Sequence, residues 1–188
     1  MAFVVRTTVR CPCSSKDATR DSSYLRLVSV PWDVPFELPH DYQLTEGRGV
    51  ELRGGRDAVI FGYGPVLLGE AVKAAALLSA HHGIQAAVIN LPWLNRIDRD
   101  WFADAVRDRG AIFTLDNHFI HGGQGDMLLR TLAETTDGHS SPHRVVRRLG
   151  ILDVPFCGRN DEVLRAHCLD AESLCETIAA AIAARVNA

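Results

Sequence analysis

The sequence predicts an α/β fold in which a mostly parallel sheet of about five strands lies between two layers of helices, a three-layer α/β/α sandwich. Short apolar segments of strand length alternate with longer segments whose apolar residues recur at helical spacing. Two strand candidates, 57–62 and 85–91, are apolar almost throughout, as in strands buried on both faces. Glycine-containing turns connect strands to the helices that follow, an arrangement typical of parallel sheets.

Composition narrows the class of protein. The chain has 188 residues, 47% hydrophobic and 23% charged, with a net charge of −3. It can therefore bury a core of its own, and it offers no overall attraction for nucleic acid or an anionic membrane. No apolar segment approaches the ~20 residues of a membrane helix. Five scattered cysteines do not form a disulfide framework, so we expect a cytoplasmic protein.

The chain divides at about residue 48. Residues 1–23 are polar and poorly periodic, whereas 23–30 alternates like a strand. Prolines at 31, 35 and 39 then exclude a helix or a central strand and predict an extended connector. We expect Trp32 and Phe36, which have no core beneath them in this segment, to dock on the main domain or on a partner. The main domain is predicted to span 49–188.

The first half of the main domain has clear helix boundaries. Pro65 suits the first turn of a helix, and Gly83 suits its end. Asp98 begins the next helix, which turns Trp101, Phe102 and Val106 inward. The expected elements are strands at 49–53, 57–62 and 85–91 and helices at 64–80 and 98–109.

The second half continues the alternation. The segment AIFTLD is a third buried strand, and an apolar helical pattern follows a glycine turn. Alternating arginines in 143–151 fit a strand with solvated basic side chains. Asn160 and Asp161 are predicted to cap a short helix, and Asp170 to start an alanine-rich one. The expected elements are strands at 111–116 and 143–151 and helices at 126–134, from 160 and from 170.

The glycine turn after the first buried strand does not predict a nucleotide site. Its sequence, GYGPVLLG, has Leu67 where a dinucleotide fingerprint needs a third glycine, and Pro65 removes one N–H group. The sequence also contains neither the GxxxxGK[ST] pattern of phosphate-binding loops nor the GxSxG pattern of hydrolases. A tight turn with close strand–helix packing accounts for this segment.

The turn in DNHFIHGGQGDMLL, residues 116–129, is the stronger candidate site. Two histidines three positions apart lie beside glycines that open a helix, a pattern that suits an anion site or an acid–base site. The alternative is that the glycines only permit the turn and the histidines lie at an interface or in solvent. The candidate residues are Asp116, Asn117, His118, His121, Gly122, Gly123 and Gly125.

Three segments carry a resemblance to a known family: 44–78, 114–132 and 158–174. Over 49–181 the chain resembles the C-terminal domain of the transketolase family, most closely that of 1-deoxy-D-xylulose-5-phosphate synthases. Where the family has an acidic pair, this sequence has Asp116 and Asn117. By the same resemblance, residues 1–48 are similar to the end of the preceding pyrimidine-binding domain and its linker.

The resemblance implies a role within a larger enzyme. Members of the family use thiamine diphosphate and Mg²⁺ to transfer two-carbon units, and they bind both through a Gly-Asp-Gly…Asn motif in another domain. That motif is absent from this sequence. The resemblance therefore implies no catalytic, cofactor-binding or metal-binding residue here. It implies a structural role against the cofactor-binding domains or subunits of the same enzyme, in a homodimer.

In this interpretation residues 116–125 form the edge of the domain that faces those partners. The alternative is a free-standing regulatory α/β module that binds phosphate or another anion at the turn from Gly122 to Gly125.

Overall fold

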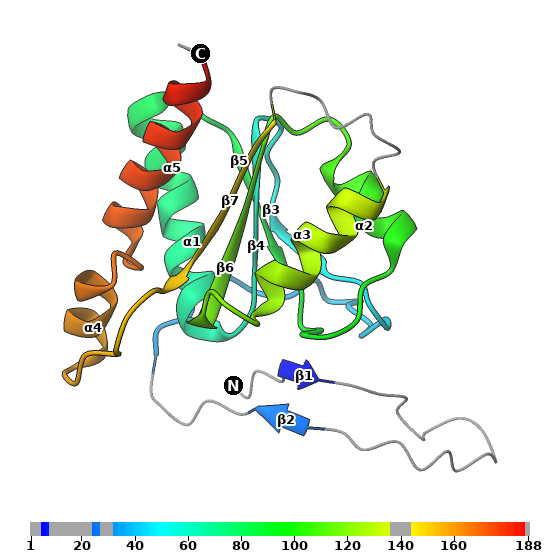
Figure 1. The fold of residues 1–188 in the computed structure, drawn as a ribbon, viewed down its shortest axis with the longest axis horizontal. Coiled ribbons are helices and arrows are strands. Elements are labelled where there is room, and N and C mark those ends of the chain that lie inside the picture. Colours follow the sequence, from blue (N-terminus) through cyan, green and yellow to red (C-terminus); the bar gives the residue numbers. More distant parts are fainter. Residues whose placement is uncertain (1–4, 8–23, 27–31, 136–143, 187–188) are drawn as a thin grey trace.

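A computed structural model describes residues 5–7, 24–26, 32–135 and 144–186. It contains a five-stranded sheet with the order β3-β5-β4-β6-β7, between two layers of helices (Figure 1). The predicted three-layer α/β/α class is confirmed. The strands are β3 (Val50–Arg53), β4 (Ala58–Gly62), β5 (Ala86–Asn90), β6 (Ala111–Phe119) and β7 (Val145–Ile151).

The central strands begin level with one another and run in the same direction. Ala58 of β4 is paired with Ala86 of β5 on one side and with Ala111 of β6 on the other. Only the edge strand β3 is antiparallel, paired with β5. The carboxyl ends of β4, β5, β6 and β7 therefore meet at one edge of the sheet.

The helices cover the two faces of the sheet separately (Figure 1). On one face, α1 packs against α5, and α4 precedes α5; α2 and α3 cover the other face. Strand β4 contributes to both cores, because Ile60 packs beneath α1 and Phe61 lies 5.4 Å from the ring of Phe102 on α2. The helices are α1 (Pro65–Leu77), α2 (Arg99–Val106), α3 (Gln124–Thr135), α4 (Asn160–Ala166) and α5 (Ala171–Val186).

Two helix boundaries lie where the sequence predicted them, at Asp98 and Gly83. Asp98 caps α2, since its side chain accepts a hydrogen bond of 3.0 Å from the Trp101 N–H. The segment after β4 is helical to His82, with a final π-helical turn, η1 (Leu78–His82), and it ends at Gly83 with φ of 67°. Glycine reaches that left-handed conformation without strain.

The segment before the main domain packs on α1. A Cβ atom at Gly69 would lie 3.2 Å from Pro35, and the Lys73 ammonium lies 6.0 Å from the centre of the Trp32 ring. Phe36 packs against the core on the α1 side of the sheet. Both aromatic residues thus dock on the main domain, which was one of the two expected outcomes.

Some predicted boundaries were wrong. Strand β6 continues to Phe119, because its pairing with β7 resumes at Phe119 and Ile151 after an irregularity beyond Leu115. Helix α3 begins at Gln124, two residues before the predicted start at 126, because the carboxylate of Asp116 on β6 accepts hydrogen bonds from its first N–H groups. Arg159, not Asn160 or Asp161, is the N-terminal cap of α4; its backbone N–H donates to Glu162 at 3.1 Å.

The N-terminal segment also differs from the prediction. Residues 1–23 gave no strand signal, yet the short strand β1 (Val5–Thr7) pairs antiparallel with β2 (Tyr24–Arg26). A three-residue strand is too short to produce a recognisable alternation in sequence. The remainder of the predicted strand at 23–30 lies outside the described residues.

Candidate functional site at the carboxyl edge of the sheet

A cavity of about 730 Å³ opens at the carboxyl edge of the sheet, between the ends of β4 and β6. The connection that leaves β4 runs through α1 on one face to β5, whereas the connection that leaves β6 runs through α3 on the other face to β7. The crevice where neighbouring connections diverge is the usual ligand position in open α/β sheets. Tyr63, Asn117, His118 and Ile151 are among its lining residues.

Asp116 organises this edge. Its carboxylate is fully buried and accepts hydrogen bonds from the Gln124 N–H at 2.7 Å, the Gly125 N–H at 3.0 Å and the Tyr63 hydroxyl at 3.3 Å. The carboxylate therefore caps α3 from a neighbouring strand. Burial raises the pKa of Asp116 and outweighs these hydrogen bonds, which act in the opposite direction.

The glycines of the turn make room for that carboxylate. A Cβ atom at Gly123 would lie 2.6 Å from the Asp116 side chain, and one at Gly125 would lie 2.4 Å from Thr114 Oγ1. Gly122 has φ of 75°, and its N–H donates to Asp126 at 2.5 Å. The glycines thus serve a turn whose N–H groups are hydrogen-bonded to side chains of the same chain.

Gln124 is a further site residue that the sequence reasoning missed. Its side chain is buried, and its amide donates to the carbonyls of Leu91 at 2.7 Å and Trp93 at 2.9 Å. These bonds connect the start of α3 to the loop after β5. The available signal was the position of Gln124, a polar residue between two glycines near a predicted helix start. Tyr63, which also belongs to the site, offered the same signal, because it lies between two glycines in the turn after β4.

This arrangement disfavours an anion at the turn. The N–H groups of Gly122, Gln124 and Gly125 already donate to carboxylates of the chain itself. Asp126 is in turn paired with Arg148, so this arginine is already engaged by a carboxylate of the chain. An incoming anion would have to displace a buried carboxylate and then remain beside it, which electrostatic repulsion opposes.

The two histidines lie outside this hydrogen-bonded cluster. His118 is exposed at the end of β6, where its Nδ1 lies 3.2 Å from the Phe119 carbonyl oxygen; His121 is exposed in the turn. Among the described residues, no group of three or more His, Cys, Asp or Glu side chains could hold a metal ion. Of the predicted site residues, Asn117, His118, Gly122 and Gly123 line the cavity. Asp116 and Gly125 are buried at the start of α3, and His121 lies at the surface.

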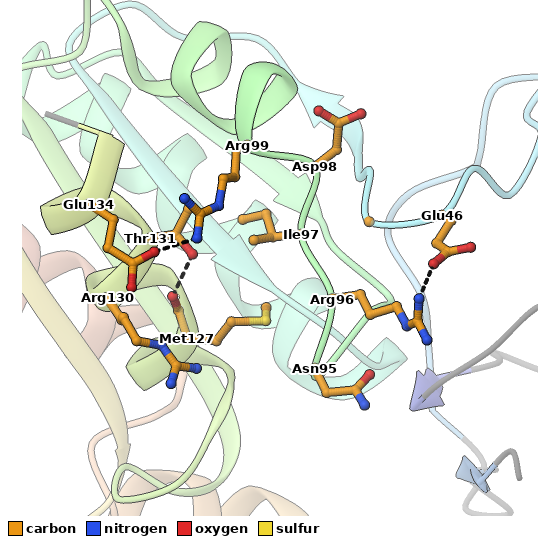
Figure 2. Close-up of a pocket in the computed structure, with 11 residues that line it drawn as sticks. Glu46, Asn95, Arg96, Ile97, Asp98, Arg99, Met127, Arg130, Thr131 and Glu134 are labelled. Atoms are coloured by element: carbon orange, nitrogen blue, oxygen red, sulfur yellow. Dashed lines mark hydrogen bonds and ion pairs between the residues drawn. The ribbon is translucent and has the colours of Figure 1, made fainter. Parts of the chain in front are cut away.

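A second groove, of about 850 Å³, lies between the loop before α2 and one face of α3 (Figure 2). Three arginines and three acidic residues line it. Arg96 is paired with Glu46, and Arg99 with Glu134, as Figure 2 shows. Because three basic and three acidic side chains line the groove, and four of the six form two ion pairs, the groove has no excess charge with which to select a charged ligand.

No helix within the described residues combines the length and hydrophobicity required to cross a membrane.

The sheet order and the capped turn at the carboxyl edge define a three-layer α/β/α domain with a mostly parallel sheet. The family model described as "Transketolase, C-terminal domain" matches residues 47–174. The chain belongs to this family, as the resemblance predicted.

Sequence relatives agree with this assignment. A 1-deoxy-D-xylulose-5-phosphate synthase from Heliobacterium modesticaldum is 37% identical over 129 residues, which cover 67% of this chain and 19% of the relative. One of the subunits of an apulose-4-phosphate transketolase from Actinobacillus succinogenes is 30% identical over 144 residues, covering 73% of this chain and 44% of the relative. The chain thus spans about a fifth of the synthase and less than half of the transketolase polypeptide.

Solved structures share the fold. A split-gene transketolase, described as an inactive beta4 tetramer, has a TM-score of 0.68 and 29% identity over 80% of this chain and 47% of its own. A transketolase from Pichia stipitis has a TM-score of 0.52 at 18% identity over 74% of this chain and 18% of its own, a likeness of fold alone.

Proposed function

We propose that this chain provides the C-terminal section of a thiamine-diphosphate-dependent transketolase-type enzyme that transfers two-carbon ketol units. Its role is structural: it supports the subunit interface and does not catalyse the reaction alone. The observation that carries the proposal is the family match over residues 47–174. We further propose that the enzyme works in the cytoplasm as a homodimer of complete units, together with the cofactor-binding domains or subunits.

The residues that the structure describes do not fit the cofactor. Thiamine diphosphate needs a Mg²⁺ site, and no suitable cluster of ligands occurs among the described residues. The sequence also lacks a Gly-Asp-Gly motif. The one fully buried acid at the candidate site, Asp116, is already hydrogen-bonded to α3 and Tyr63. We therefore assign the cofactor and Mg²⁺ to the rest of the assembly and assign no catalytic step to this chain.

Calorimetry and reconstitution test the proposal. Titration of the isolated chain with thiamine diphosphate and Mg²⁺ should give no binding heat, and the chain should show no ketol transfer. Activity should require co-expression with the thiamine-diphosphate-binding polypeptide encoded in the same genome. Micromolar cofactor binding by the isolated chain would contradict the proposal, as would a failure to associate with any such polypeptide.

The free-standing anion-binding module makes a different prediction. A ligand at 100 times its dissociation constant adds about 2.7 kcal/mol to the free energy of unfolding. Because the N–H groups of the turn are already bonded to carboxylates, we expect no thermal shift with phosphate or sugar phosphates. A clear shift with phosphate or a sugar phosphate would instead support the module.

A further inference from the structure

An exposed apolar surface lies beside the cavity at the carboxyl edge. Its members come from the end of β6 and the loop after β7, and they are exposed to between 38% and 83%. They account for four of the five large exposed hydrophobic side chains of the described residues. We name this surface the edge patch; it consists of Phe119, Leu152, Val154 and Phe156.

The edge patch is held in place. Phe119 is paired with Ile151 in the sheet, and the Ile120 N–H donates to the Ile151 carbonyl at 3.1 Å. Further along the loop, the Phe156 N–H donates to Nε2 of His167 at 3.2 Å, and the two rings lie 5.3 Å apart. The exposed side chains of the edge patch therefore lie on an ordered surface. A partner that binds there loses little free energy in ordering the loop.

The edge patch is continuous with the cavity. Phe119 belongs to both, and Ile151 and Pro155 line the cavity from the same loop region. The other walls are mainly apolar or carry neutral amides, such as Asn95 and Asn117. An uncharged, partly apolar side chain therefore suits this cavity, as in interfaces where a buried anchor residue is surrounded by apolar contacts.

The size of the surface indicates its occupant. With these exposed fractions, the four side chains offer roughly 450 Å² of apolar area. A stable dimer of separate chains buries about 800 Å² on each partner. The edge patch alone is thus too small to hold two free copies of this chain together, but it is large enough to add to a more extensive interface within one enzyme.

We propose that the edge patch and the adjoining cavity dock an apolar side chain from the cofactor-binding portion of the enzyme. This inference rests on the proposed function and specifies its contact surface. Two outcomes compete with this proposal: a second copy of this chain binds to the edge patch, or no partner binds to it.

Photo-crosslinking in the cells that encode the chain tests whether the edge patch contacts the cofactor-binding portion of the enzyme. The full chain carries p-benzoylphenylalanine in place of Val154 or, as a matched control, in place of Leu44, which is also exposed but lies outside the edge patch. Adducts are mapped by mass spectrometry. We expect position 154 to form an adduct with a polypeptide that carries the Gly-Asp-Gly…Asn motif. We also expect Val154→Asp to weaken that association at least tenfold, and Leu44→Asp to leave it within twofold.

The outcomes separate the two proposals. If only position 44 crosslinks to the cofactor-binding polypeptide, the proposed function stands and the edge patch is the wrong surface. If position 154 crosslinks to a second copy of this chain, the docking proposal is refuted. If neither position reaches a cofactor-binding polypeptide, the proposed function itself fails. Circular dichroism of each variant confirms that its fold is unchanged.

Discussion

The carboxylate of Asp116 joins β6, α3 and Tyr63, so its removal should lower stability more than any exposed aspartate could. Asp116→Ala leaves the N–H groups of Gln124 and Gly125 and the Tyr63 hydroxyl without their buried acceptor. Asp116→Asn keeps the shape of the side chain but replaces one acceptor oxygen with an NH₂ group that faces a donor.

The magnitude follows from these contacts. For the Gln124 and Gly125 N–H groups, loss of the helix-capping side chain costs about 1 kcal/mol, and the Tyr63 hydroxyl becomes one further unpaired buried donor at roughly 1–3 kcal/mol. Because Asp116 is fully buried, water does not readily replace it. We expect Asp116→Ala to lower the free energy of unfolding by about 3 kcal/mol, and Asp116→Asn by about 1–2 kcal/mol.

The acidity of Asp116 adds a pH dependence. Its pKa is raised in the folded chain from its ordinary value of 3.8, with burial as the largest cause. The folded state therefore holds this proton more tightly than the unfolded state. The stability that this carboxyl contributes is largest below pH 3.8 and declines as the pH rises through its folded pKa. The advantage of wild type over Asp116→Asn should decline over the same range and then stay constant.

Urea unfolding followed by circular dichroism, repeated from acidic to neutral pH, measures both effects. Asp104→Ala is the control, because the Asp104 side chain is 65% exposed and forms only a surface pair with Arg107. That change should alter the free energy of unfolding by less than about 0.5 kcal/mol. If Asp116→Ala were equally mild, or if the wild-type advantage grew with pH, the account of a buried capping carboxylate would be wrong.

Three further substitutions test the same edge and the end of α4 by urea unfolding. Gln124→Ala should cost about 2 kcal/mol because two buried carbonyls lose their donor; a change below about 0.5 kcal/mol would mean that water replaces the amide. Gly125→Ala places a Cβ atom 2.4 Å from Thr114 and should lower the free energy of unfolding by more than about 2 kcal/mol. In the control Gly54→Ala the nearest atom is 3.4 Å away, so the loss should be far smaller, and equal effects would refute the packing argument. Cys168, just after α4, has φ of 56°, a conformation that glycine adopts without strain. Cys168→Gly should therefore raise the free energy of unfolding by roughly 0.5–1 kcal/mol. A decrease would show that the Cys168 side chain contributes more than the strained backbone costs.

Much of the fold could be predicted because it depends on local patterns. The apolar segments at 57–62, 85–91 and 111–116 became the buried strands β4, β5 and β6. Pro65 lies at the first position of α1, and Asp98 caps α2. In each case residues close in sequence determine the backbone conformation, through periodicity, a fixed φ or a capping side chain.

The candidate site was only partly predictable, because its contacts join distant residues. The sequence located the turn and named Asp116 and its glycines, but it suggested free N–H groups for an anion. The fold instead brings in Tyr63, 53 positions away, and sets Asp116 against the start of α3. Helix propensity does not reveal which side chain occupies a helix N-terminus when that side chain comes from another strand.

The sequence by itself determined the class of fold, the order of its strands and helices along the chain, and the resemblance to its family, because these depend on residue type and spacing. Only the tertiary structure decided that β3 pairs antiparallel at the edge, that Asp116 fills the turn, and that Phe119 gathers with residues 152–156 on one surface. The physical reason is that pairing, burial and exposure depend on neighbours in space, and the sheet brings those neighbours together from segments far apart in the chain.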